Sequence, residues 1–197
     1  MKKSLPELML PVLLVVLGIC LCAATGCTST SSDTISPDAT SAPATTTAPG
    51  TAKGSVTAVP FATLMTFLPD APAGWTAEEP AGATWTVEDG QWSFASCGYA
   101  RGDTQVVVVL QDSAYYDVGY WQLWDTLTSI ETSDGYYRQG RVSGHPSWEC
   151  FSKPATYTAW VGVNERFMVY VGVEDGSRQD LDSFVNAIDY RGIEALK

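Results

Sequence analysis

The chain has few of the residues that enzyme active sites require. Among 197 residues there is one histidine, His145. A single imidazole excludes sites that need two, including most catalytic zinc arrangements. There is no Gly-x-Ser-x-Gly elbow of a serine hydrolase and no glycine-rich strand-to-helix turn of a dinucleotide-binding fold. The sequence therefore indicates no catalytic residue, no metal ligand set and no cofactor.

Basic residues are also scarce. The chain contains 11 Lys and Arg against 22 Asp and Glu, which gives a formal net charge of −11. A surface of this sign repels phosphate backbones and anionic headgroups, and no basic cluster interrupts it. We therefore expect no nucleic-acid partner.

One long apolar run, Leu8–Cys27, stands near the N-terminus. Lys2 and Lys3 precede it, and it closes on the small-residue tetrapeptide Ala24-Thr25-Gly26-Cys27, as a secretory signal does. The tetrapeptide resembles the lipobox of prokaryotic lipoproteins, which implies cleavage before Cys27 and diacylglycerol on its thiol. An uncleaved signal anchor is the alternative, because the run is just long enough to span a bilayer. Both interpretations place the remaining chain outside the cytoplasm, attached to the cell membrane and facing the exterior or periplasm.

The next segment has the composition of a linker. Residues 28–59 contain fifteen Ser or Thr, three Pro and almost no large apolar residue. Such a segment cannot bury enough surface to offset its ordering entropy, so we expect a disordered tether with an end-to-end distance of roughly 30 Å. The predicted organisation is a signal peptide over 1–26, a lipid-attachment cysteine and linker over 27–59, and one domain over 60–197.

The periodicity of the last segment predicts hairpins and a few helices. Apolar residues at helical spacing predict short helices over 60–68 and 116–130 and a C-terminal helix with Leu181, Phe184, Val185 and Ile188 on one face. The pair Asp89-Gly90 is a strong hairpin signal. Strands are expected at 83–88, 91–100, 104–110, 136–143, 147–151, 157–163 and 166–174.

These elements predict an α+β domain, with an antiparallel sheet of about six to eight strands and helices packed on it. The order of helix, hairpins, helix, hairpins and terminal helix over residues 61–197 resembles the Mog1/PsbP type of sandwich. The resemblance implies a non-enzymatic assembly or binding protein.

Two cysteines, Cys97 and Cys150, remain once the leader is removed and Cys27 carries lipid. In an oxidising exterior each has only the other as a partner, so we expect a disulfide between them; two buried thiols are the alternative. A nucleophile pair of either cysteine with His145 can also be written, but an exposed loop histidine is the simpler interpretation.

Aromatic residues are abundant. All seven Trp lie in the predicted domain, together with all nine Tyr. Trp85, Trp148, Trp160 and Tyr170, if they share a sheet face, could stack sugars or hold a protein partner. The competing interpretation is that helices or a second layer cover them as core.

Carboxylates occur in pairs, which leaves a second functional class open. The pairs are Glu78 with Glu79, Glu88 with Asp89, Glu174 with Asp175, and Asp180 with Asp182. A glycosidase needs two carboxyl groups facing each other across a cleft, and calcium could use the last two pairs, although their spacing matches no EF-hand. The sequence thus favours a membrane-anchored, non-catalytic binding or assembly module, with a tethered hydrolase using paired carboxylates as the alternative.

The anchor can be tested directly. We expect the mature protein to begin at Cys27 with added acyl mass, and Cys27→Ser to remove the lipid without changing the fold, since the tether transmits no packing. Mass spectrometry of the N-terminal peptide decides between the two interpretations. An intact leader on the wild-type protein would show a signal anchor instead.

Overall fold

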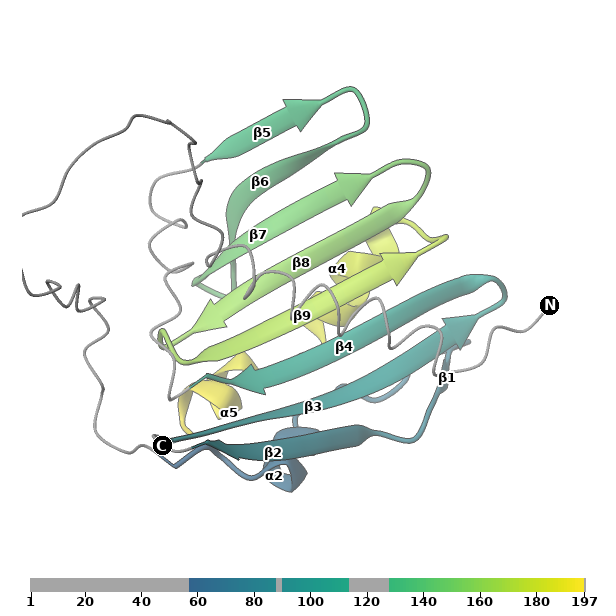
Figure 1. Cartoon of the computed structure of the whole chain (residues 1–197). Coiled ribbons are helices and arrows are strands. Elements are labelled where there is room, and N and C mark those ends of the chain that lie inside the picture. Colours follow the sequence, from purple (N-terminus) through teal and green to yellow (C-terminus); the bar gives the residue numbers. More distant parts are fainter. Residues whose placement is uncertain (1–56, 88–89, 114–127, 197) are drawn as a thin grey trace, which may run out of the picture. The chain divides into compact units, whose positions relative to one another are not determined.

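The β-rich runs form a single antiparallel sheet. The computed structural model describes residues 57–87, 90–113 and 128–196, and within them nine strands join in the order β1-β3-β4-β9-β8-β7-β6-β5, with β2 also paired to β3 (Figure 1). The strands are β1 (Thr76–Ala77), β2 (Ala81–Val87), β3 (Gly90–Arg101), β4 (Thr104–Asp112), β5 (Ser129–Thr132), β6 (Gly135–Val142), β7 (His145–Ser152), β8 (Thr156–Val163) and β9 (Phe167–Glu174).

Three short helices complete the described part: α2 (Phe61–Met65), α4 (Arg178–Asn186) and α5 (Tyr190–Glu194). None of these described helices is long and apolar enough to cross a membrane. The predicted leader, the lipid-attachment residue Cys27 and the predicted tether up to residue 56 lie outside the described residues. The antiparallel α+β class is as expected, but the nine strands exceed the predicted six to eight.

All three helices pack on one face of the sheet, which we call the helix face. In Figure 1, α4 and α5 lie behind the strands. The apolar stripe of α4 is buried as predicted, and Phe184 contacts the rings of Trp75 and Tyr99 at centroid distances of 5.0 and 4.7 Å. Burial of a side chain such as Phe184 stabilises the fold by about 2–3 kcal/mol.

Valine rows form the sheet's contribution to this core. Side chains alternate between the two faces of a strand, so Val106, Val108 and Leu110 of β4 point to the helix face, where they are buried. Their partners on β9 are Val173, Val171 and Val169. The four consecutive valines of 106–109 therefore form a central strand, as predicted, although Val107 and Val109 on the other face are only half-buried.

The N-terminal boundary of the domain differs from the prediction. Ala58 and Val59, which their composition assigned to the linker, are buried. The Val59 amide donates to Oδ2 of Asp112 at 2.7 Å, and its carbonyl accepts from the Ser93 hydroxyl at 2.5 Å. A composition count cannot reveal that the backbone of Val59 is hydrogen-bonded to two distant strands. The folded part therefore begins before residue 60.

The predicted helix over 116–130 is wrong at its end. Ser129 and Ile130 belong to β5, where they pair with Arg138 and Tyr137 of β6. The rest of that predicted helix lies outside the described residues. Ile130 lies three residues after Leu127 and so continues the helical spacing, but its pairing with Tyr137 of β6 outweighs this local signal.

The predicted disulfide is also wrong. Cys97 on β3 and Cys150 on β7 are free, buried thiols. Strands β4, β9 and β8 lie between them, and four strand spacings amount to about 19 Å. The register also points Cys97 to the helix face and Cys150 to the opposite face, whereas a disulfide needs Cβ atoms about 4 Å apart. The alternative of two buried thiols is what the structure contains.

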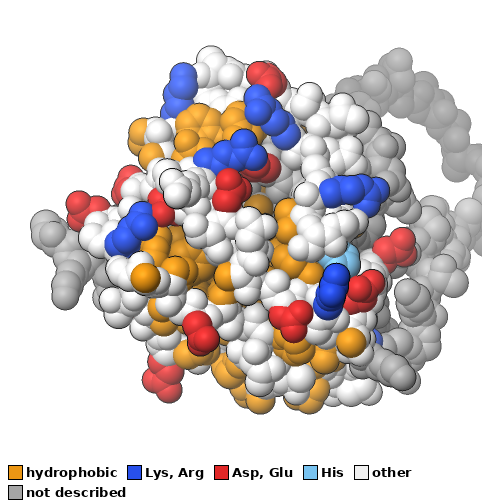
Figure 2. Space-filling model, turned by 180° about the vertical axis from the view of Figure 1, so that it is seen from behind, with side chains coloured by type: hydrophobic (Ala, Val, Ile, Leu, Met, Phe, Trp, Pro, Cys, Tyr) orange, Lys and Arg blue, Asp and Glu red, His pale blue; other side chains and the backbone are white. Residues whose placement is uncertain are grey.

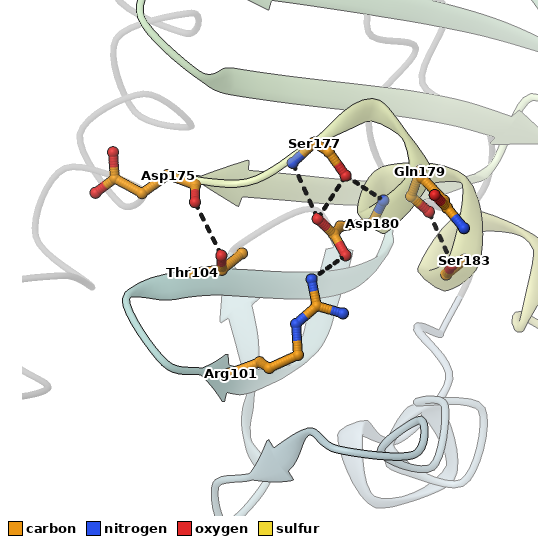
Figure 3. A network of polar contacts seen from close by, with 7 residues as sticks. All are labelled: Arg101, Thr104, Asp175, Ser177, Gln179, Asp180 and Ser183. Atoms are coloured by element: carbon orange, nitrogen blue, oxygen red, sulfur yellow. Dashed lines mark hydrogen bonds and ion pairs between the residues drawn. The ribbon is translucent and has the colours of Figure 1, made fainter.

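A polar network fixes α4 to the hairpin of β3 and β4 (Figure 3). Arg101, at the end of β3, donates to Oδ1 of Asp180 at 2.6 Å, and Asp180 and Ser177 form a reciprocal capping box at the helix start. Burial alone would raise the pKa of Asp180, but the hydrogen bonds from Ser177 and the Arg101 guanidinium outweigh it and hold this pKa below its ordinary value.

Loss of this cap should lower stability in a pH-dependent way. The pKa of Asp180 is lowered in the folded state. The carboxylate therefore contributes its full share to the free energy of unfolding at pH values above its ordinary pKa of 3.8, and this share is lost as the pH falls through the folded-state pKa. We expect Asp180→Asn to lower the free energy of unfolding by about 1–2 kcal/mol at pH 7, and the difference from wild type to shrink below pH 4.

Urea unfolding at pH 7 and pH 3 measures this effect. The matched control is Asp182→Asn, because Asp182 lies one half-turn away and is 4.0 Å from its nearest cationic partner, Arg178. This control should change stability by less than about 0.5 kcal/mol. Equal effects of the two substitutions on the free energy of unfolding would contradict the role of Asp180 as the stabilising cap of α4.

The thiols give a second test of the fold. In the mature chain Cys97 and Cys150 should both react with an alkylating reagent in denaturant without any reductant, because they are not bonded to each other. Under native conditions both should be protected by burial. Mass spectrometry counts the labels. If the unfolded, unreduced protein takes up no label, Cys97 and Cys150 are bonded and the free thiols are contradicted.

Candidate binding surface

The aromatic residues that the sequence suggests as a binding surface lie on the face of the sheet opposite the helices. Trp148 of β7 is directly opposite Trp160 of β8, and Trp160 is opposite Tyr170 of β9. The same row continues through Val109 of β4 to Ser96 of β3. Because side chains alternate along a strand, these five residues all point to one side. We call it the aromatic face.

Trp85 belongs to the same face at its other end. It stacks on Trp92 with ring centroids 4.0 Å apart and on Phe94 at 5.0 Å. Trp85 is 37% exposed, so one of its sides is available for contact. Cross-strand aromatic pairs of this kind also stabilise a hairpin. The four residues singled out in the sequence are therefore placed together on one face.

A glycine lies beside the Tyr170 ring in the middle of the aromatic face. The rings of Trp160 and Tyr170 are 5.3 Å apart. A Cβ atom at Gly172 would lie 2.6 Å from the Tyr170 hydroxyl, so the tyrosine ring lies along the strand over this glycine. Burial, with a further contribution from the nearby Glu174 carboxylate, raises the pKa of Tyr170 to about 12, which keeps its hydroxyl protonated at any physiological pH.

Charge is scarce on this face. Along β2, β3, β4, β9, β8 and β7, the described strand positions that point to it include one charged residue, Glu174, at the end of β9. The remaining positions hold apolar, aromatic, glycine and uncharged polar residues. Arg141 of β6 points to the same face, and the Glu78 carboxylate lies over Gly98 of β3. In a chain with 33 charged residues, the row from Trp148 to Ser96 is itself uncharged, so it is adapted to an uncharged contact.

The helix side has the opposite character. Figure 2 views the molecule from behind and shows acidic and basic side chains spread among apolar ones. A groove of about 380 Å³ lies here between α4 and strands β6 and β7. Arg178 pairs with Glu149 at 2.8 Å, and the Tyr136 hydroxyl donates to the same carboxylate at 2.6 Å. Burial and this bond raise the pKa of Tyr136 to about 12.

The paired carboxylates do not meet in this groove. Of the residues in the four pairs, only Asp182 lines it. Both oxygens of Asp180 are engaged by Ser177 and Arg101, and Glu88 and Asp89 lie outside the described residues. Among the described residues no group of three or more His, Cys, Asp or Glu side chains is arranged to hold a metal ion.

The structure separates His145 from both cysteines. His145 is the first residue of β7 and is half-buried near Tyr190, with ring centroids 5.7 Å apart. It therefore begins a strand, where an exposed loop had been the simpler interpretation. Cys150 lies five residues along the same strand and so points to the other face, and Cys97 is four strands away. Neither thiol can use this imidazole as a base.

Sequence reasoning missed Trp92 and Phe94. With Asp89-Gly90 as the central residues of the turn, Trp85 would have faced Phe94, but the observed register pairs Val87 with Gly90 and therefore Trp85 with Trp92. A shift of the turn by one residue moves the partner by two. The hairpin signal was present, but its register was not readable to that precision.

Comparison of the chain with protein-family models, with curated proteins and with solved structures gives no significant match in any of the three.

Proposed function

We propose that this protein is a membrane-anchored, extracytoplasmic lipoprotein that acts as a non-catalytic binding or assembly module, and that the aromatic face is its binding surface. The observation that carries the proposal is the gathering of Trp85, Trp148, Trp160 and Tyr170 on one sparsely charged face on which none of the described helices lies. Large apolar surfaces of this kind mark binding sites in soluble domains.

The domain does not need this face for its core. The buried cluster is built from helix-face residues of β3, β4, β8 and β9 with Leu64 of α2 and the apolar stripes of α4 and α5. None of the four aromatic residues belongs to it, although Trp148 is itself buried. Of the described helices none covers the tryptophans, which argues against the competing interpretation for this part of the chain.

The predicted anchor fits a binding role. A tether of roughly 30 Å would hold the domain close to the membrane while leaving it free to turn toward a partner. The tether joins the fold at Thr57, whose carbonyl accepts from Arg166 at 3.3 Å. The resemblance to Mog1/PsbP sandwiches implies the same class of non-enzymatic protein. The partner class left open is a protein or a carbohydrate, and no nucleic acid.

The tethered hydrolase has less support. It requires two carboxyl groups facing each other across a cleft. In the described part of the chain, the groove brings one residue of the paired carboxylates, Asp182, near Glu149, and Arg178 contacts both. The arginine neutralises the charges that a general acid and base would use.

The proposal predicts that the aromatic face retains a partner. Trp85→Ala combined with Trp160→Ala should reduce recovery of co-purifying material from native membranes on the order of tenfold, because truncated aromatic anchors remove most of the contact energy. The matched control is Phe61→Ala, since Phe61 is 36% exposed, against 37% for Trp85, but lies on α2 on the helix side.

Quantitative mass spectrometry of the recovered material measures this effect, after circular dichroism has shown that both variants fold. Unchanged recovery with the double variant, or equal loss with Phe61→Ala, would contradict the aromatic face as the binding surface.

A further inference from the structure

Three polar groups on the aromatic face have no hydrogen-bond partner in the described structure. They are Oγ of Ser96, Nε1 of Trp148 and Oγ1 of Thr158, and all three atoms are buried. Ser96 is 2% exposed and Trp148 is 8% exposed. Buried polar groups in proteins are paired as a rule, and an unpaired one calls for a specific explanation.

Two of these groups are neighbours. Trp148 faces Trp160 across the β7–β8 ladder, and Thr158, two residues before Trp160, faces Cys150. Trp148 and Thr158 are therefore diagonal neighbours, at a separation of about 7–8 Å between their positions on the sheet. One small polar group placed between them can meet both side chains.

The third group lies at the other end of an apolar row. Between Trp148 and Ser96 stand Trp160, Tyr170 and Val109, one from each intervening strand. Four strand spacings separate the ends, or about 19 Å. The face therefore combines two polar ends, whose unpaired atoms are buried, with an elongated apolar and aromatic floor between them.

The chemistry of the unpaired groups restricts the ligand. An indole N–H can only donate, and a serine or threonine hydroxyl can donate as well as accept. The ligand must therefore offer acceptor oxygens. A charged head is disfavoured because the row holds no countercharge and the whole chain has a net charge of −11.

Resting on the proposed function, we propose that the aromatic face binds an uncharged membrane amphiphile. Its apolar chain lies along Trp160, Tyr170 and Val109, and the ester carbonyl oxygen of its head accepts from Trp148 Nε1 and Thr158 Oγ1. The predicted tether keeps the domain within roughly 30 Å of the bilayer, which is the source of such molecules.

The test compares two uncharged probes that differ in one oxygen acceptor. Monolauroylglycerol carries an ester carbonyl, and 1-O-dodecylglycerol has an ether in its place. Each is titrated below its critical micelle concentration into the mature chain with Cys27→Ser, so that no attached acyl chain competes. Tryptophan fluorescence reports the Kd. We expect saturable binding of both, with the ester on the order of twentyfold tighter, because it accepts two hydrogen bonds of about fivefold each.

Two variants assign the preference to its residues. Trp148→Phe keeps an aromatic ring but removes the donor, and Thr158→Val keeps the shape but removes the hydroxyl. Each should reduce the preference for the ester about fivefold, because one of the two hydrogen bonds is lost, while leaving the ether bound as before. Thr84→Val is the matched control, because Thr84 is an exposed residue of β2 whose side chain points to the other face. If Trp148→Phe fails to fold, the preference for the ester over the ether in the wild type and in Thr158→Val still tests the proposal.

The outcomes separate this inference from the proposed function. No saturable binding of either probe, or equal affinity for ester and ether in the wild type, overturns the amphiphile. If the Trp85 and Trp160 variant nevertheless loses its co-purifying partner, the binding module stands and its ligand is of another class. If that variant loses nothing either, both proposals fall.

Discussion

The structure depends on one buried carboxylate. Asp112, at the end of β4, receives Nε and Nη2 of Arg166 at 2.9 and 2.8 Å and the amide of Val59 at 2.7 Å. A buried charge is tolerated only when it is paired and hydrogen-bonded, so these three partners are held together as a unit. Arg166 follows Asn164 and Glu165, which both adopt left-handed backbone conformations in the β8–β9 turn. The contact thus joins the beginning of the fold, a central strand and a tight hairpin.

This contact also determines which face each side chain occupies. Asp112 pairs with Phe167 at the end of the β4–β9 ladder, and a slip of one residue there would turn every side chain of a strand to the opposite face. The valines of β4 would then point away from α4, and Val109 would leave the aromatic row. The separation between a helix-covered core and a sparsely charged aromatic face is therefore a consequence of register. Both properties are fixed by the same hydrogen bonds.

Much of the local structure was predictable from the chain. The central β8–β9 hairpin follows from two β-rich runs around Asn164, and the buried stripe of α4 follows from Leu181, Phe184 and Val185 at helical spacing. The errors came where distant contacts outweigh local pattern. Val59 has a linker-like neighbourhood but is held by Ser93 and Asp112, and Ile130 pairs with Tyr137, which no local count reveals.

The sequence by itself determined the acidic balance, the alternation within each strand and the abundance of tryptophan. It could not determine that Trp148, Trp160 and Tyr170 stand in one row, or that Cys97 and Cys150 point to opposite faces. Alternation shows which side chains of one strand share a face. A short hairpin turn also relates the faces of its two strands, because the turn fixes their register. The ladder between β4 and β9 joins segments more than fifty residues apart, and no local turn sets its register. Only the tertiary structure, through that ladder and the Asp112 contact at its end, decided which residues share a face.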